Sequence, residues 1–435
     1  MGQNREQGTI ITLVAVFMLF VVGAMAALSI DVVTLYTARS EAQLVADAAA
    51  LAAARVLANS GATSDSSGTL IASAELSTGP AQQVAIQVAQ GSMVGGRALN
   101  SGTCPGAEIC VSFNNGSGPP YTNPHVTVTV QRADLPTFFA RIWGNTQLAV
   151  AASATAEAYN PTGGTGASNT TSPPVAPLCV KPWLLPNIDP STGNAIFDSF
   201  GNINDSKLLG WSSTSPPPTP MTLACASGNC SGALPNPAAW NYYPGDPTTT
   251  FPPPTTALPT CSQIPTLTPY QASVAGCIQT AISCNNPNAN VDASNYGTRN
   301  SETANAVNCL AHDTTFGEGD TVISTVPPPQ NTPFQFVAGN DNPITGAGTD
   351  VMVSDSLVTV PVFDTASFNT SGTNFHIIGF VQLFLNPDSN PADPTTGNVN
   401  TTIINMAGCG GTSAGATPIL GNGASPVAVR LISPP

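Results

Sequence analysis

Charged side chains are scarce in this chain of 435 residues, since Asp, Glu, Lys and Arg together make up 8% of it. Ten residues are Lys or Arg and 24 are Asp or Glu, which leaves a net charge of −14. Between Lys207 and Arg430 the only basic residue is Arg299. A nucleic-acid-binding protein needs clustered cations that displace counterions from phosphates, so these numbers exclude nucleic acid as a partner.

The chain also lacks any C-x2-C pair, which removes the usual spacing of a zinc site. All ten cysteines follow the N-terminal region, and an even number outside a membrane indicates disulfides. These are Cys104, Cys110, Cys179, Cys225, Cys230, Cys261, Cys277, Cys284, Cys309 and Cys409. Turn residues separate Cys104 from Cys110 and Cys225 from Cys230, so we expect these two pairs to be oxidised. The other pairings stay open.

One long apolar run is present, from Gln7 to Ile30, with 24 residues and no formal charge. As a helix it is about 36 Å long, enough to cross a hydrocarbon core of about 30 Å. The positive-inside rule places Met1 in the cytoplasm and the chain after Asp31 outside. The alternative is a signal peptide cleaved after Ala24-Met25-Ala26, an A-x-A pattern.

An alanine-rich helix is predicted directly after this run. Small or apolar residues recur in steps of three and four along one side, a pattern typical of one helix face. They are Leu35, Ala38, Ala42, Val45, Ala49, Ala52 and Val56. Alanine allows close approach of another backbone while burying little apolar area. This seam therefore indicates a neighbour, which is either a partner protein or the chain's own globular domain.

The N-terminal residues resemble those of TadE/TadG-like proteins of bacterial Flp (tight adherence) pilus assembly. The resemblance is carried by Gly8, the apolar run ending in Ile30-Asp31, Leu35-Tyr36-x-x-Arg39, and Gln43-x-x-x-Asp47 followed by an alanine run to Arg55. It implies an inner-membrane-anchored component of pilus assembly or secretion with its bulk in the periplasm.

Two features of such families are missing here. Leu13 stands five residues after Gly8, where pilin-like members cut by prepilin peptidase have Glu, so we expect no processing there. Longer TadG relatives carry a D-x-S-x-S metal motif, which this chain lacks, so no metal-dependent adhesion follows from the resemblance.

The predicted fold class is α+β, with five segments. Residues 1–8 form a short cytoplasmic segment and residues 9–30 a transmembrane helix. Residues 31–160 form an extracytoplasmic α+β domain, 161–178 a flexible linker, and 179–435 a Pro-, Thr- and Asn-rich, mostly β region with disulfides.

Within residues 31–160, Pro80 predicts the start of a helix that runs through Gln90. Strands are predicted at 107–113, 125–131 and 146–159, and a short helix at 135–143. Val126, Val128 and Val130 share one strand face, with Thr127 and Thr129 on the other.

Later in the chain, residues 350–363, 375–385 and 398–406 read as strands of a β-meander. Pro361 predicts that its strand is at an edge or bulged.

No catalytic or metal site emerges from the residue patterns. Gly411-Thr-Ser-Ala-Gly415 matches the G-x-S-x-G nucleophile elbow, but no histidine follows His376, and a Gly/Ser loop explains the match. His125, His312 and His376 are too scattered to be metal ligands by spacing. Oxygen-rich clusters at 386–393 and 189–205 could suit calcium, but Asx-rich turns explain them equally. We expect no enzyme activity and no cofactor.

The functional hypothesis is therefore a scaffold, held in the bacterial inner membrane, whose partners are other pilus-assembly or envelope proteins. The seam Ala42, Val45, Ala49 and Ala52 is the candidate contact surface. Two alternatives remain open: a cell-surface adhesion or ligand-binding protein with the same anchor, and a secreted hydrolase with an unrecognised site.

Overall fold

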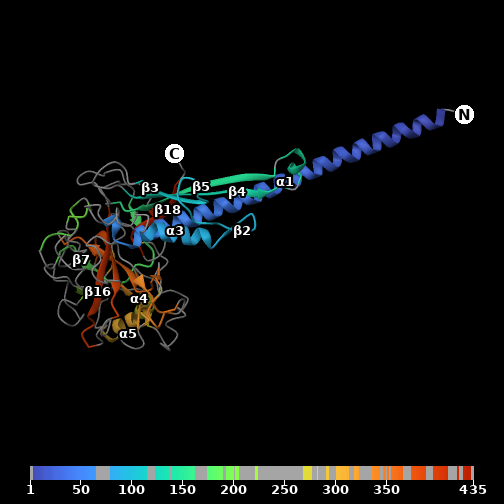
Figure 1. Cartoon of the computed structure of the whole chain (residues 1–435). Coiled ribbons are helices and arrows are strands. Elements are labelled where there is room, and N and C mark those ends of the chain that lie inside the picture. The colour runs from blue at the N-terminus through green and yellow to red at the C-terminus, as the bar shows by residue number, and fades with distance from the viewer. Residues whose placement is uncertain are drawn as a thin grey trace.

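The fold is known from a computed structural model, in which a single long helix leads into a folded body (Figure 1). The structure describes residues 3–64, 79–114, 123–137, 139–144, 146–161, 174–189, 193–199, 201–204, 221–223, 268–276, 282, 291–292, 300–312, 318–322, 336–342, 346–348, 350–351, 354–365, 374–387, 395–409, 419–420 and 425–432. Statements below concern these residues.

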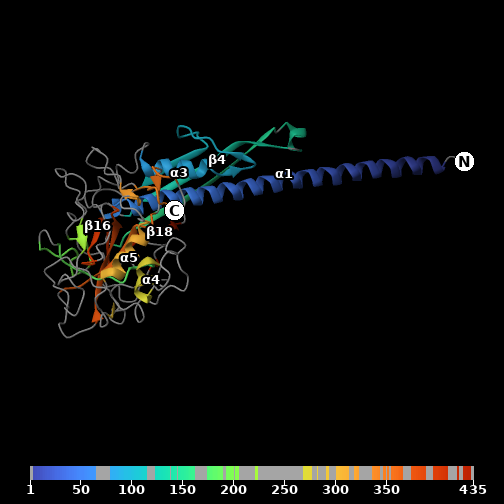
Figure 2. The same ribbon diagram turned by 90° about the horizontal axis from the view of Figure 1, so that it is seen from below.

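Helix α1 (Gln3–Asn59) continues from the apolar run into the alanine-rich stretch without a break. Its N-terminal half extends away from the body, whereas its C-terminal half lies within it (Figures 1 and 2). Ile10–Asn59 contains the one segment of the described chain that is long and apolar enough to cross a membrane. The continuity expected from the helical spacing at Leu35 is therefore observed.

The N-terminal domain is a four-stranded antiparallel sheet covered on one face by α1 and α3 (Pro80–Gln90). The strand order is β18-β5-β4-β3. These strands are β3 (Ile109–Asn114), β4 (His125–Pro136), β5 (Gln147–Tyr159) and β18 (Ala428–Ile432). The buried and partly exposed residues of β4 alternate, with the valines facing the helices and the threonines facing away, as the sequence predicts.

Strand β18 belongs to this N-terminal sheet although it lies at the other end of the chain. Ala428 pairs with Tyr159 and Ile432 pairs with Thr155. The domain expected within 31–160 is thus completed by a strand from the predicted C-terminal region, 179–435. The segment 161–178 also differs at its end, because β6 (Val175–Ala176) is a buried strand paired with β17 (Ile419–Leu420).

The C-terminal region is built on a five-stranded sheet with the order β7-β13-β15-β16-β8. Its centre is the predicted meander, formed by β13 (Leu357–Phe363), β15 (Ile377–Leu385) and β16 (Val399–Gly408). Two short strands, β7 (Leu185–Pro186) and β8 (Met221–Leu223), flank it. Helices α4 (Pro269–Ala275) and α5 (Asn300–Leu310) contribute to the same hydrophobic core.

The prediction for Pro361 is confirmed in part. A register shift follows between Val362 and Phe363, and beyond β13 only the two-residue strand β7 pairs in the sheet. The carbonyl of Thr359 accepts the backbone N–H of Lys181 on that outer side. Pro361 follows Thr359 by two residues in the same strand, so its nitrogen faces the same sparsely paired side. The N–H group that proline lacks therefore costs the sheet no hydrogen bond.

The remaining regular elements are short. They are η1 (Ala62–Ser64), η2 (Ala140–Trp143), β1 (Met93–Val94), β2 (Arg97–Ala98), β9 (Val291–Asp292), β10 (Thr321–Val322), β11 (Phe336–Val337), β12 (Asp350–Val351) and β14 (Asn374–Phe375). The prediction of a helix over 135–143 is wrong in its first half. Strand β4 continues through Leu135 and Pro136 past a register shift, and only a 3-10 turn, η2, follows.

Candidate functional site at the base of the anchor helix

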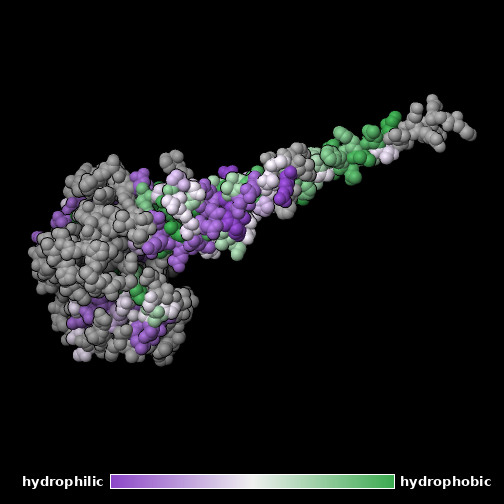
Figure 3. Space-filling model, viewed as in Figure 1, coloured by the Kyte–Doolittle hydropathy of each residue, from purple (hydrophilic) through white to green (hydrophobic). Residues whose placement is uncertain are grey.

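The apolar half of α1 has no packing partner on most of its surface. Thirteen large apolar residues between Ile10 and Ile30 are exposed to solvent, with 48% to 75% of their surface accessible. In Figure 3 the coloured residues of the projecting part of α1 are largely apolar, whereas more polar residues are coloured on the adjacent part of the body. Such an area is unfavourable in water by roughly 25 cal/mol per Å², so this segment is a candidate membrane anchor.

Asp31 marks the point where the rod meets the body, and it is 5% exposed. Its Oδ2 atom accepts the backbone N–H groups of Phe139 and Ala140, at 3.0 and 2.8 Å. These groups open η2, in the connection between β4 and β5, and would otherwise lack partners at the start of a helical turn. Asp31 thus ties this connection to the helix immediately after the apolar run.

A second carboxylate on α1 fixes a second loop. The Oε2 atom of Glu41 accepts the backbone N–H of Gly95 at 2.6 Å, in the turn between β1 and β2. Gly95 has φ +57°, a backbone conformation that favours glycine, and a Cβ atom there would lie 2.4 Å from Leu135 Cδ2. Between the two carboxylates lies a cavity of about 370 Å³ whose apolar wall includes Leu35, Leu135 and Leu148.

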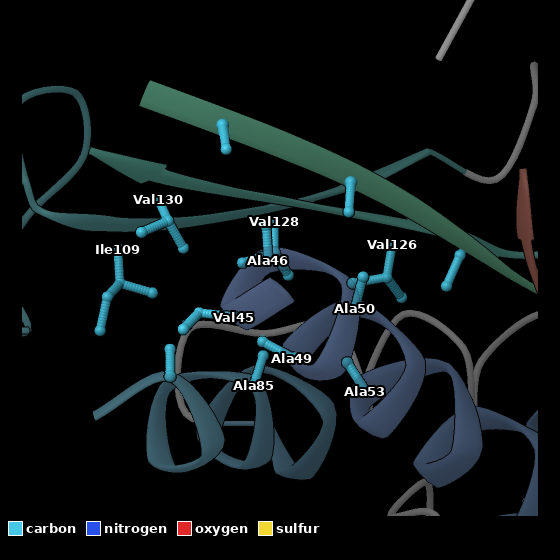
Figure 4. Close-up of a cluster of buried hydrophobic side chains, with 14 of the residues drawn as sticks. Val45, Ala46, Ala49, Ala50, Ala53, Ala85, Ile109, Val126, Val128 and Val130 are labelled. Atoms are coloured by element: carbon cyan, nitrogen blue, oxygen red, sulfur yellow. The ribbon is translucent and has the colours of Figure 1, made fainter. Parts of the chain in front are cut away.

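The alanine seam above this site packs inside the chain. Ala42, Val45 and Ala49 are each at most 4% exposed, in a cluster with α3 and the sheet valines. Figure 4 shows Ala49 of α1 facing Ala85 of α3, with Val126 and Val128 of the sheet on the other side of α1. Ala52 is only partly buried. Of the two neighbours that the sequence left open, the structure shows the chain's own domain.

Two polar residues of the family-like motif also support this packing. Gln43 donates to Asp47 Oδ1 at 2.8 Å and to the carbonyl of Ser153 on β5 at 3.3 Å. Gln43 is exposed, and its bond to the sheet joins residues 110 positions apart, which residue spacing does not predict.

The C-terminal end of α1 is joined to the second sheet by buried amides. Gln382 donates to Asn59 Oδ1, and Asn405 donates to both the Ala58 carbonyl and Gln382 Oε1. Asn160, at the end of β5, donates to the carbonyl of Met406 at 2.9 Å. Gln382 and Asn405 are at most 1% exposed. Because unpaired buried amides are costly, this junction holds the two sheets in one arrangement.

An ion-pair cluster joins β2 to β4 and to Glu108, the residue before β3. Arg97 pairs with Glu108 and with Asp134, and Arg132 Nε lies 2.7 Å from Asp134 Oδ1. The hydrogen bond from Arg97 lowers the pKa of Glu108, and the one from Arg132 lowers the pKa of Asp134. Asp134 is exposed, Arg97 and Glu108 are partly exposed, and Arg132 is buried. Ion pairs between exposed or partly exposed groups, such as Arg97 with Asp134, contribute little to stability.

Lys181 is a buried cation in the C-terminal region that sequence reasoning did not single out. Burial lowers its pKa to about 7, with a partial opposing effect from Asp355. Its ammonium donates to the carbonyl of Gly276 at 2.7 Å.

The predicted disulfide between Cys104 and Cys110 is present. Cys179, Cys309 and Cys409 are also disulfide-bonded. The pair Cys225 and Cys230 lies outside the described residues.

The three histidines lie apart from one another, and two of them, His125 and His312, lie next to a carboxylate. His125 Nε2 lies 3.4 Å from Glu157 Oε1, and His312 Nε2 lies 2.9 Å from Asp355 Oδ2. Asp198 uses both carboxylate oxygens to bind Asn202, as an Asx-rich turn requires. The segment 411–415 and most of 386–393 lie outside the described residues.

Comparison with known proteins matches only the N-terminal part. No curated protein and no solved structure matches the chain. Residues 8–56 match the family model described as "Putative Flp pilus-assembly TadE/G-like". The matched range covers the apolar half of α1, Asp31, Glu41 and the buried seam. This match confirms the resemblance carried by Gly8 to Arg55, and it identifies residues 8–56 as a TadE/G-like segment that supports involvement in Flp pilus assembly.

Proposed function

We propose that the chain is a non-enzymatic scaffold of Flp pilus assembly, anchored in the inner membrane by Gln7–Ile30 with its body in the periplasm. The observation that carries the proposal is the division of α1. One unbroken helix is exposed and apolar in its first half and is built into a folded core in its second. The family match spans both halves.

The mechanism is positional. From Asp31 to Asn59 the helix rises about 40 Å, and its end is fixed to the C-terminal sheet through Asn59 and Gln382. The scaffold therefore presents the acidic C-terminal region at a set distance from the membrane. The seam serves the chain's own core, so contacts with other assembly proteins fall to other surfaces.

Deletion of the gene in its native host tests this function. We expect cells without the protein to lose Flp pili, counted by electron microscopy, and a plasmid copy of the wild-type gene to restore them. If piliation is unchanged while attachment to surfaces is lost, the adhesion alternative replaces the proposal.

A further inference from the structure

The connection between β4 and β5, residues 137–146, has an unusual composition. Its sequence is TFFARIWGNT, with three aromatic residues in ten, whereas the whole chain is 6% aromatic. Arg141 is its only charged residue. We refer to residues 137–146 as the hairpin tip. Aromatic residues with an arginine are typical of segments that lie at a membrane–water interface.

Asp31 holds the backbone of the hairpin tip at Phe139 and Ala140. The bonds from Phe139 and Ala140 to this carboxylate place the tip one residue beyond Ile30, the last residue of the apolar run. The polar layer of a bilayer is roughly 5–8 Å thick on each side, and one helical residue rises about 1.5 Å. With the apolar run in the membrane, the tip therefore lies at the level of the lipid headgroups.

Burial along α1 agrees with this level. Ala27 lies one turn before Asp31 on the same face and is 5% exposed, although Ala26 and Leu28 beside it are exposed. Protein therefore covers this face of the helix slightly inside the end of the apolar run. The hairpin reaches out beside α1 in both ribbon views (Figures 1 and 2).

The charge of the tip suits the same surroundings. Arg141 is exposed, on a chain whose net charge of −14 would otherwise be repelled by anionic lipids. An arginine near a membrane surface is attracted by the negative charge of anionic headgroups. The carboxylate of Asp31, which lies near the tip, already accepts two N–H groups of the tip.

We propose that the hairpin tip is a second membrane-contact element, which lies among the lipid headgroups beside α1 and binds the bilayer itself. A single helix leaves the body free to tilt about its base. A second contact displaced from the helix axis fixes the direction in which the body leans. This inference rests on the membrane anchoring proposed above.

Quenching of Trp143 fluorescence tests the contact. Full-length protein is reconstituted in phosphatidylcholine–phosphatidylglycerol vesicles, with or without bromine on the acyl chains just below the headgroups. We expect brominated lipid to quench the wild-type protein more than Trp143→Phe, which keeps an aromatic ring at the tip. Trp183 is 0% exposed in the C-terminal core and is an internal reference. Near-UV circular dichroism checks that both proteins are folded.

A second variant, Asp31→Ala, removes the acceptor that holds the tip, and we expect part of the quenching to be lost. If wild type and Trp143→Phe float with the vesicles and are quenched equally, the tip does not contact lipid and the inference is overturned, while the anchor stands. If the wild-type protein does not float with the vesicles, the anchor fails, and this inference fails with it.

Discussion

Replacing Ala49 by leucine tests the internal seam. Ala49 lies on α1, is 0% exposed and packs against α3 and the sheet, so three added carbon atoms must displace a helix or a strand. Overpacking of this kind typically costs about 1–3 kcal/mol of unfolding free energy. With a urea dependence of about 2 kcal/mol per molar, the unfolding midpoint falls by roughly 0.5–1.5 M.

The neighbouring residue supplies a matched control. Ala48 is exposed on the same helix turn, so Ala48→Leu makes the same chemical change in solvent and should alter stability by less than about 0.5 kcal/mol. Unfolding of the full chain in detergent is followed by near-UV circular dichroism. Equal midpoints for the two variants would refute the conclusion that the seam is a core surface.

Three further outcomes are expected. Asn405→Ala removes the donor to Gln382 Oε1 at the junction, which should lower the free energy of unfolding by about 1–3 kcal/mol. It should also speed amide hydrogen exchange at the end of α1. Unchanged exchange would argue against a coupled junction. Lys181 binds a proton more weakly in the folded protein than in the unfolded chain, so the free energy of unfolding of the wild type should rise between about pH 7 and pH 10. Lys181→Met should reduce this rise, measured by urea titrations at the two ends of the range. Parallel pH profiles of the two proteins would contradict the lowered pKa. Asp31→Ala should speed exchange of the Phe139 and Ala140 amides, measured by mass spectrometry, and protection equal to wild type would show that Asp31 does not hold the tip.

Local patterns in the sequence predict the local elements well. Pro80 and the glycines after Gln90 bound α3 as expected, and the alternation of valine and threonine identifies β4. These signals depend on neighbours a few residues apart. They also identify the apolar run that is a candidate membrane anchor and part of the buried face of the helix.

Contacts between distant residues were not predictable in this way. The pairing of Arg430 with Glu157 closes the N-terminal sheet with a strand from the far end of the chain. Asp31 looks like an ordinary flanking charge until its partners, 108 and 109 residues away, are seen. Both depend on tertiary structure, which residue spacing does not encode.

A scaffold that acts by position must be held at the membrane by α1 in order to support pilus assembly. The most direct measurement is the number of Flp pili on cells whose only copy of the gene has a cleavable signal peptide in place of residues 1–30. We predict that the released body accumulates in the periplasm without restoring pili, whereas the intact chain restores them. Full piliation with the released body would show that pilus assembly does not need the body to be held at the membrane.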